Sequence, residues 1–301
     1  MTICVAGICE RGKSIVVVAD QKLSATAYSA DSMVLKVFGL RNNWGVMWAS
    51  EKVTAVSSVL YAAAEACKSK AQYPDMVKAF RAALQGCLLE NATARVLGPF
   101  GIDMKKFLAK GKMMFTEGEH ADIVKKLLSE CTESEFMVFG FDRRNQAHIF
   151  TVVDQDATIK TEGHTIVGFA AIGSGADMAQ SSLFFHKYSK NYSLDLATYL
   201  LCEAKFMAES AEGVGEDTLC IVHRPQAKTF PLFPAHVQQI REFWQTYGKP
   251  KIPADAPVFV SAVLQQAERE VSELSAARAK KRQSENDSTA PSTSEQSESE
   301  P

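Results

Sequence analysis

The stretch that decides the fold is the N-terminus, MTICVAGICERGKSIVVVAD, residues 1–20. Two runs rich in β-branched residues, TICVAGIC and SIVVVAD, flank the polar, glycine-containing segment ERGK. This pattern predicts a β-hairpin. It also places a threonine directly behind the initiator methionine. Thr2 is a good strand former in its own right, but removal of Met1 would give it both a free α-amine and a hydroxyl.

The order of elements along the rest of the chain indicates the fold class. Hydrophobic periodicity predicts two further strands, two helices, three strands, a strand that leads into two more helices, and a closing strand. Two antiparallel sheets flanked by helix pairs would satisfy this order, so we expect an α+β fold, a four-layer α/β/β/α sandwich. The predicted segments are strands over 35–40, 43–50, 135–142, 146–154, 157–163, 169–172 and 217–224 and helices over 51–70, 74–92, 176–188 and 193–211.

Changes of composition divide the chain. We expect one domain over residues 2–224, interrupted by a helical excursion at about 95–133 where glycines and a proline break the pattern. Residues 225–282 follow as a helical extension. The tail, residues 283–301, is rich in Ser and Glu and carries no bulky apolar residue, which predicts disorder.

Composition and charge exclude several classes of function. The 301 residues carry a formal net charge of -2, which gives no support to nucleic-acid binding. No targeting or membrane-spanning segment is visible, so a cytoplasmic protein without membrane contact is expected. The seven cysteines form no CxxC pair and have no suitably spaced histidine, which predicts free core thiols, no metal site and no cofactor.

Two charged residues and a turn match a known pattern. Asp20 ends the second strand, and Lys36 follows sixteen residues later on a predicted strand. The segment AAIGSGADMAQ, residues 170–180, places a Gly-Ser-Gly turn before a helix. Together with Thr2, these features resemble the proteasome-type N-terminal-nucleophile (Ntn) hydrolases, the family of proteasome β subunits. The opening MTICVAG is most similar to the bacterial proteasome-ancestor-like (Anbu) branch.

The resemblance implies a catalytic role for each matching residue. The hydroxyl of Thr2 would be the nucleophile, with its own α-amine, which titrates at about 7.7–8.0, as the base. Lys36 would stabilise charge that develops on the hydroxyl oxygen, Asp20 would hold Lys36, and Ser174 would lie near the nucleophile. Ser50, fourteen residues after Lys36, stands where the family has a glycine whose N–H serves as oxyanion donor.

Two regions depart from the family pattern. After the last long helix the family has an Asp and a Ser-Gly-Gly that organise the amine, whereas this chain has AESAEGVGEDT, residues 208–218. Glu209, Ser210, Glu212 and Asp217 are the candidates to support the amine instead. Trp48 takes the place of a residue that lines the substrate pocket, and it either fills that pocket or belongs to the core.

The function implied by the resemblance is that of a threonine peptidase or amidohydrolase that cleaves amide bonds, foremost peptide bonds. Its partners would be a peptide or protein substrate and further copies of the chain in a ring or spiral. The helices after residue 224 would serve that association or pack on their own subunit. A catalytically inactive proteasome-like assembly subunit is the alternative, favoured by the altered 208–218 segment. A transferase or acylase on the same fold has no residue that distinguishes it.

Overall fold

The computed structural model divides the chain into two compact units, Met1–Tyr247 and Gly248–Pro301, and the first contains every element discussed below. The predicted disordered tail lies outside the described residues, as does most of the predicted extension beyond residue 249. The structure describes residues 2–25, 28–30, 35–40, 43–50, 52–67, 72–130, 132–155, 158–225, 229–249, 260–261, 263–266 and 273.

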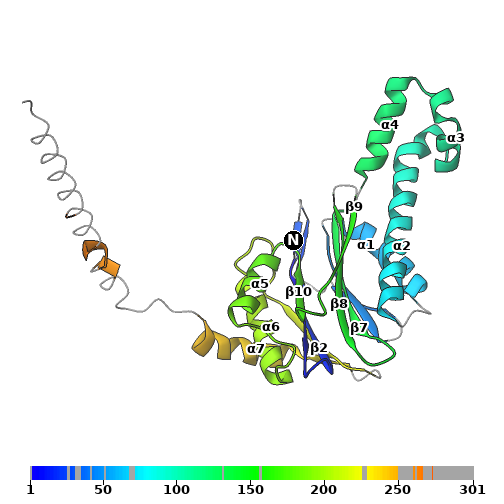
Figure 1. Cartoon of the computed structure of the whole chain (residues 1–301). Coiled ribbons are helices and arrows are strands. Elements are labelled where there is room, and N and C mark those ends of the chain that lie inside the picture. Colours follow the sequence, from blue (N-terminus) through cyan, green and yellow to red (C-terminus); the bar gives the residue numbers. More distant parts are fainter. Residues whose placement is uncertain are drawn as a thin grey trace, which may run out of the picture. The chain divides into compact units, whose positions relative to one another are not determined.

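Two antiparallel five-stranded sheets form the centre of the first unit (Figure 1). One sheet has the order β10-β1-β2-β11-β12 and the other the order β5-β6-β7-β8-β9. The first consists of β1 (Cys4–Cys9), β2 (Ser14–Asp20), β10 (Phe169–Ile172), β11 (Thr218–His223) and β12 (Phe230–Leu232). The second consists of β5 (Val37–Leu40), β6 (Trp44–Ser50), β7 (Ser134–Phe141), β8 (Ala147–Gln155) and β9 (Thr158–Gly163). A separate hairpin joins β3 (Leu23–Ala25) to β4 (Tyr28–Ala30).

Helices cover the outer face of each sheet (Figure 1). Helices α5 (Ala176–Phe185) and α6 (Leu194–Ala208) share a hydrophobic cluster with the first sheet. Helices α1 (Val53–Cys67) and α2 (Tyr73–Ala92) share another with the second sheet. A third cluster fills the space between the sheets. The layers therefore follow the order helix, sheet, sheet, helix.

The two strands of the opening hairpin are mostly apolar, and both of their faces are covered. Side chains alternate between the two faces of a strand. Val5 and Val16 accordingly pack toward α5 and α6, while Cys4 and Val17 pack toward the second sheet. Every residue of β1 and β2 is buried. The continuous apolar run that predicted the hairpin is thus a consequence of burial on both sides.

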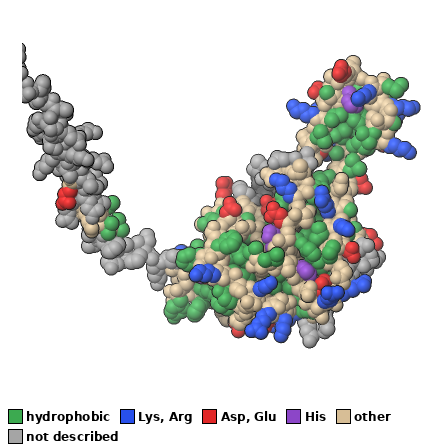
Figure 2. All heavy atoms as spheres, viewed as in Figure 1, with side chains coloured by type: hydrophobic (Ala, Val, Ile, Leu, Met, Phe, Trp, Pro, Cys, Tyr) green, Lys and Arg blue, Asp and Glu red, His purple; other side chains and the backbone are tan. Residues whose placement is uncertain are grey.

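The excursion at 95–133 is helical and extends beyond α2, away from the sheets (Figure 1). A π-helical turn and a 3-10 turn lead to α3 (Met104–Met114) and α4 (Glu117–Ser129), which share a small hydrophobic cluster of their own. Leu108, Met113 and Leu128 nevertheless remain largely exposed, and hydrophobic side chains lie beside Lys and Arg side chains on this region (Figure 2).

The expectation of an α+β fold with two antiparallel sheets is confirmed. The sequence did not predict the β3–β4 hairpin or the short strand β12. Strand β12 and helix α7 (Pro234–Phe243) follow the domain boundary that the sequence predicts at residue 224, and both belong to the first compact unit. Among the described residues, no helix is long and apolar enough to cross a membrane.

Candidate active site

Three segments of the two sheets meet at the N-terminus of β1. Pairing of β1 with β2 sets Cys4 opposite Ala19, and the N–H of Asp20 donates to the carbonyl of Ile3 at 3.0 Å. Asp20 is therefore carried to the start of the chain by the hairpin itself. Lys36 arrives from the other sheet, as the residue directly before β5. The hairpin and the contact between the two sheets together bring Thr2, Asp20 and Lys36 to one corner.

The three polar side chains at this corner contact one another directly. The Nζ of Lys36 lies 2.7 Å from Oδ1 of Asp20. The hydroxyl of Thr2 accepts a hydrogen bond from Lys36 and donates one to Asp20. Exposed fractions are 4% for Thr2, 0% for Asp20 and 2% for Lys36. Charge-assisted hydrogen bonds strengthen in a low-dielectric surrounding, and this geometry places the Nζ of Lys36 directly against the threonine oxygen.

Asp20 is the residue through which the corner is organised. Its Oδ1 accepts from Lys36, from the Thr2 hydroxyl and from the N–H of Ile3 at 3.0 Å. Its Oδ2 accepts from the N–H of Gly215 at 3.2 Å. A buried carboxylate needs such donors to offset the loss of its hydration. One side of Asp20 thus faces the threonine and the other side faces the loop that precedes β11.

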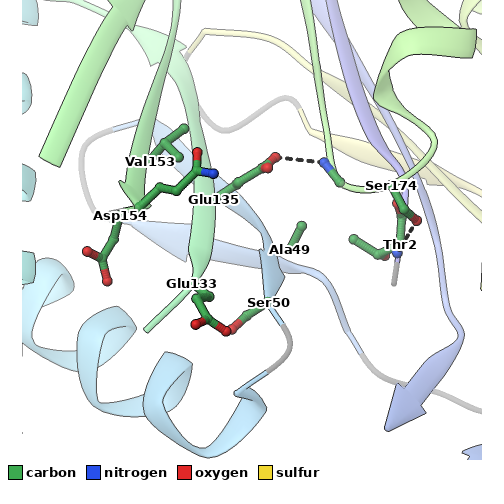
Figure 3. A pocket seen from close by; sticks show the side chains of 10 residues that line it. Thr2, Ala49, Ser50, Glu133, Glu135, Val153, Asp154 and Ser174 are labelled. Atoms are coloured by element: carbon green, nitrogen blue, oxygen red, sulfur yellow. Dashed lines mark hydrogen bonds between the residues drawn. The ribbon is translucent and has the colours of Figure 1, made fainter. Parts of the chain in front are cut away.

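The Gly-Ser-Gly turn packs against the backbone of Thr2 (Figure 3). The main-chain nitrogen of Thr2, which would become the α-amine after loss of Met1, lies 3.3 Å from Oγ of Ser174. The N–H of Gly175 donates to the carbonyl of Thr2 at 3.3 Å. Gly173 has a φ of 94°, and a Cβ there would collide with that carbonyl oxygen. Glu135 of β7 fixes the turn from the other sheet by accepting from the N–H of Gly173 at 2.8 Å.

A cavity of about 390 Å³ opens beside this corner. Figure 3 shows Thr2 and Ser174 on one side of it, with Ala49, Ser50 and three carboxylates across from them. The cavity is large enough to accept a side chain and its backbone beside the threonine. Its lining residues are Thr2, Ala49, Ser50, Glu133, Glu135, Val153, Asp154, Gln155, Gly173 and Ser174.

The backbone direction of β6 bears on the role of Ser50. The N–H of Trp48 donates to the carbonyl of Lys36 at 3.3 Å, so it points toward β5. N–H groups two residues apart along a strand point to the same side. The pairing of β5 with β6 stops at Met47. The N–H of Ser50 therefore points toward the edge where Lys36 leads into β5. The Ser50 side chain is held separately, by Ser134 at 2.7 Å.

Trp48 belongs to the core. It is 5% exposed and lies in the hydrophobic cluster between the second sheet and helices α1 and α2. The neighbouring Ala49 lines the cavity instead. Because side chains alternate along a strand, Trp48 and Ala49 point to opposite faces of β6. Of the two interpretations of Trp48 from the sequence, the structure favours the core and not the pocket.

Three of the four candidates for amine support from the 208–218 segment have other contacts, and the fourth, Glu209, pairs with Lys205 and Arg241. The hydroxyl of Ser210 donates to the carbonyl of Met207 at 2.7 Å. Glu212 takes part only through its carbonyl, which lies 3.4 Å from Oγ of Ser174. The carbonyl of Asp217 accepts from the N–H of Gln21 at 3.2 Å. Among the contacts that the structure describes, the nitrogen of Thr2 therefore has Ser174 as its partner, and these three side chains do not reach it.

A second ion cluster, with Lys205 fully buried and its partners Glu209 and Arg241 partly buried, contacts the same loop, and the sequence did not predict it. The Nζ of Lys205, on α6, contacts the carboxylate of Glu209 and the carbonyls of Gly215 and Glu216. Arg241 of α7 pairs with Glu209 at 2.6 Å. A signal for Lys205 was present, because the helix around it is apolar on nearly every side. Such a helix is buried, and a lysine within it requires a partner.

Within the described ranges, no group of three or more His, Cys, Asp and Glu side chains could hold a metal ion. The six cysteines within the described residues are free and buried, and burial raises the pKa of Cys4, two residues after Thr2, so that it stays a neutral thiol. The corner of Thr2, Asp20 and Lys36 can therefore offer a hydroxyl, a cation, a carboxylate and backbone donors.

No family model matches the sequence, and a search of curated proteins finds no relative.

Proposed function

We propose that this chain is a threonine-type N-terminal-nucleophile hydrolase of the proteasome type, with Thr2 as nucleophile after removal of Met1. The observation that carries the proposal is the mutual contact of Thr2, Asp20 and Lys36 beside a cavity. These residues come from three separate segments, and all three are buried. Burying a cation against a hydroxyl oxygen is costly, and activation of that oxygen gives the arrangement a purpose.

In the proposed reaction the α-amine of Thr2 takes the proton of its own hydroxyl. The hydroxyl oxygen attacks an amide carbonyl, while the ammonium of Lys36 stabilises the charge on that oxygen. The N–H of Ser50 donates to the oxyanion, an interaction worth about 2.7–4 kcal/mol in other enzymes. The amine leaving group takes the proton back from the α-ammonium. Water then hydrolyses the acyl-ester and restores the free threonine.

Asp20 and Ser174 orient the reacting groups. Asp20 accepts from Lys36 at 2.7 Å and so fixes the cation against the threonine. Ser174 lies 3.3 Å from the nitrogen that acts as base. Because that nitrogen must keep a lone pair directed at the hydroxyl, a hydrogen-bond partner that fixes its rotation favours catalysis. The cavity would take the part of a peptide substrate next to the scissile bond.

The proposal includes the four-layer Ntn-hydrolase sandwich and assembly of several copies into a ring or spiral. The observed order of layers, helix, sheet, sheet, helix, supports the first part. Analytical ultracentrifugation of the full chain tests the second part. A complex of several copies is expected, and a monomer at micromolar concentration would contradict it.

The nucleophile is tested by treating the full chain with a threonine-directed β-lactone and measuring its intact mass. We expect a mass that lacks Met1 and one added acyl group per chain. The Thr2→Ala variant should show no acyl group, and Thr2→Ser should retain slower labelling because it keeps the hydroxyl. Retention of Met1, or equal labelling of Thr2→Ala, would refute the nucleophile and favour the inactive assembly subunit.

A further inference from the structure

Resting on the proposed function, we propose that Lys205 is a positioning residue that holds the closing loop, residues 209–217, against Asp20. The ion cluster of Lys205, Glu209 and Arg241 fixes the backbone of this loop. The side chains of Ser210, Glu212 and Asp217 in the loop do not themselves reach the nitrogen of Thr2. The inference assigns a role to α6 and α7, the two helices on which the cluster lies. It also links Arg241, which follows the predicted domain boundary at residue 224, to the candidate active site.

The hydrogen bonds that the structure describes for the Lys205 side chain all go to the closing loop. Its side chain is fully buried, at 0% exposure. The Nζ donates to the carbonyl of Gly215 at 2.8 Å, to the carbonyl of Glu216 at 2.7 Å and to the carboxylate of Glu209. An ammonium has three protons to donate, and these three acceptors use all of them. The loop backbone is thereby gathered around one charge.

Arg241 completes the cluster from α7. Its guanidinium forms two bonds with the carboxylate of Glu209, at 2.6 and 2.7 Å, in the two-pronged geometry that such pairs favour. It also donates to the carbonyl of Glu216 at 2.7 Å and stacks on Phe206, with Cζ 4.1 Å from the ring centre. Glu209 therefore shares its charge between two cations, and α7 is tied to the loop.

The loop transmits this constraint to the site through one backbone group. Gly215, whose carbonyl Lys205 holds, donates its own N–H to Oδ2 of Asp20 at 3.2 Å. A Cβ at Gly215 would collide with Lys22, so the backbone can approach closely only as glycine. The other oxygen of Asp20 contacts Lys36 and Thr2. A shift of the closing loop would therefore change the orientation of the carboxylate that positions the catalytic cation.

Lys205 does not itself line the cavity beside Thr2. Its loss should thus slow the chemical step while leaving binding at the cavity intact. The matched pair of variants is Lys205→Met and Lys110→Met, since Lys110 lies exposed on α3 in the helical excursion. Arg241→Met is a second variant that perturbs the same loop from outside the sandwich and keeps the test available should Lys205→Met fold poorly.

The experiment measures acylation of each full-chain variant by the β-lactone, separating the rate at saturation from the half-saturating concentration. For Lys205→Met we expect a saturating rate reduced by up to roughly 100-fold. The half-saturating concentration and the number of reactive sites per chain should stay unchanged. Arg241→Met should show a smaller loss, and Lys110→Met none. A wild-type rate in Lys205→Met, or a loss of reactive sites at an unchanged rate per site, would overturn the proposal.

The pH profile gives a signature that a merely structural role would not produce. Burial lowers the pKa of Lys205 to about 8, against the opposing effect of Glu209 and of Asp20; Arg241 lowers it further. Above that pH the wild type itself loses the charge. The gap in rate between wild type and Lys205→Met should therefore be largest near neutral pH and narrow as the pH rises through about 8. A gap that is independent of pH would contradict the role given to the charge.

Hydrogen exchange separates failure of this inference from failure of the proposed function. Amides of the closing loop should exchange faster in Lys205→Met than in wild type and Lys110→Met, whether or not the chain is acylated. Unlabelled wild type would refute the nucleophile, while the exchange result would still decide whether Lys205 holds the loop. Identical exchange in all three proteins would overturn that part.

Discussion

Two buried lysines are connected to the carboxylate of Asp20. Lys36 contacts it directly, and Lys205 is linked to it through the backbone of Gly215. Lys36 is 2% exposed and contacts the Thr2 hydroxyl and Oδ1 of Asp20. Lys205 is 0% exposed and contacts loop carbonyls, one of which belongs to the residue that donates to Oδ2 of Asp20. The same type of side chain therefore contacts the hydroxyl of the proposed nucleophile in one place and backbone carbonyls of a loop in the other. Burial alone does not distinguish the role proposed for Lys36 from that proposed for Lys205. The groups that accept their hydrogen bonds do, because Lys36 donates to the Thr2 hydroxyl and Lys205 donates to loop carbonyls.

Replacement of Lys36 should have the largest effect of any change at the two lysines. In Lys36→Met we expect turnover and β-lactone acylation to fall by roughly 10³-fold, because the cation beside the nucleophilic oxygen is lost. Asp20 keeps its bonds from Thr2, Ile3 and Gly215, so the chain should fold. The acylation rate and the far-UV circular dichroism spectrum check this.

The comparison with Lys205→Met sharpens the result. The loss in Lys36→Met should exceed that in Lys205→Met by about tenfold or more, since only Lys36 contacts the reacting atom. If the two variants lost activity equally, the distinction between a catalytic and a positioning lysine would fail. Full activity in Lys36→Met would refute its catalytic role outright.

Gly173→Ala should have an intermediate effect, because it displaces Thr2 without removing a charge. A Cβ at this position meets the carbonyl of Thr2, and the φ of 94° is strained for any L side chain. We expect a loss of about 1–3 kcal/mol in the free energy of unfolding and a markedly slower acylation. Urea unfolding and the acylation rate measure the two effects.

Gly12→Ala is the matched control for Gly173→Ala. Gly12 has a φ of 88°, but a Cβ there would meet no atom within 4 Å. It should therefore show the backbone strain without the collision, and acylate at the wild-type rate. A Gly173→Ala variant that also acylates at the wild-type rate would show that the turn does not position Thr2.

Lys205 should also make the stability of the fold depend on pH, an effect that changes no group in contact with Thr2. Burial lowers its pKa from 10.5 to about 8, so between these values the unfolded chain binds more protons than the folded one. Stability from this group therefore rises with pH in that window, by at most about 1.4 kcal/mol per pH unit. Below about pH 8 both states are protonated and the contribution is constant.

This is measured as the difference in urea unfolding free energy between wild type and Lys205→Met across that window. The difference should move in favour of wild type as pH rises, while the gap in acylation rate narrows. The two trends run in opposite directions. Deprotonation of Lys205 removes the cost of burying its charge, which stabilises the fold, but it weakens the hydrogen bonds from Lys205 to the loop, which slows acylation. A difference in stability that falls with pH would contradict a buried, desolvated Lys205.

The part of the site that the sequence predicts is the part built by short-range order. Thr2 and Asp20 are joined by one hairpin, and Lys36 follows sixteen residues after Asp20. The strands that carry Asp20 and Lys36 are recognisable from their β-branched residues. The sixteen-residue spacing of the two charges on these strands could therefore be compared with the spacing in the family. Ser174 is 172 residues from Thr2, and its place beside Thr2 was expected only because its Gly-Ser-Gly turn resembles the family pattern.

The rest of the site depends on contacts between distant segments, which spacing does not encode. Glu135 reaches the turn at Gly173 across 38 residues, and Arg241 reaches Glu209 across 32. The sequence could indicate that 208–218 departs from the family pattern, but not that α7 would return to pack beside it. Trp48 illustrates the same limit, because its one-residue offset from Ala49 decides whether it faces helices or cavity.

The measurement that tests the central claim most directly is tandem mass spectrometry of the N-terminal peptide after treatment of the full chain with a peptide epoxyketone. This reagent requires both groups of a free 1,2-amino alcohol, which only an N-terminal Thr or Ser supplies. The account predicts a peptide that begins at Thr2 and carries the reagent on that residue, with none in Lys36→Met over the same time. An intact Met1, or a reagent attached elsewhere such as Cys4, would contradict it.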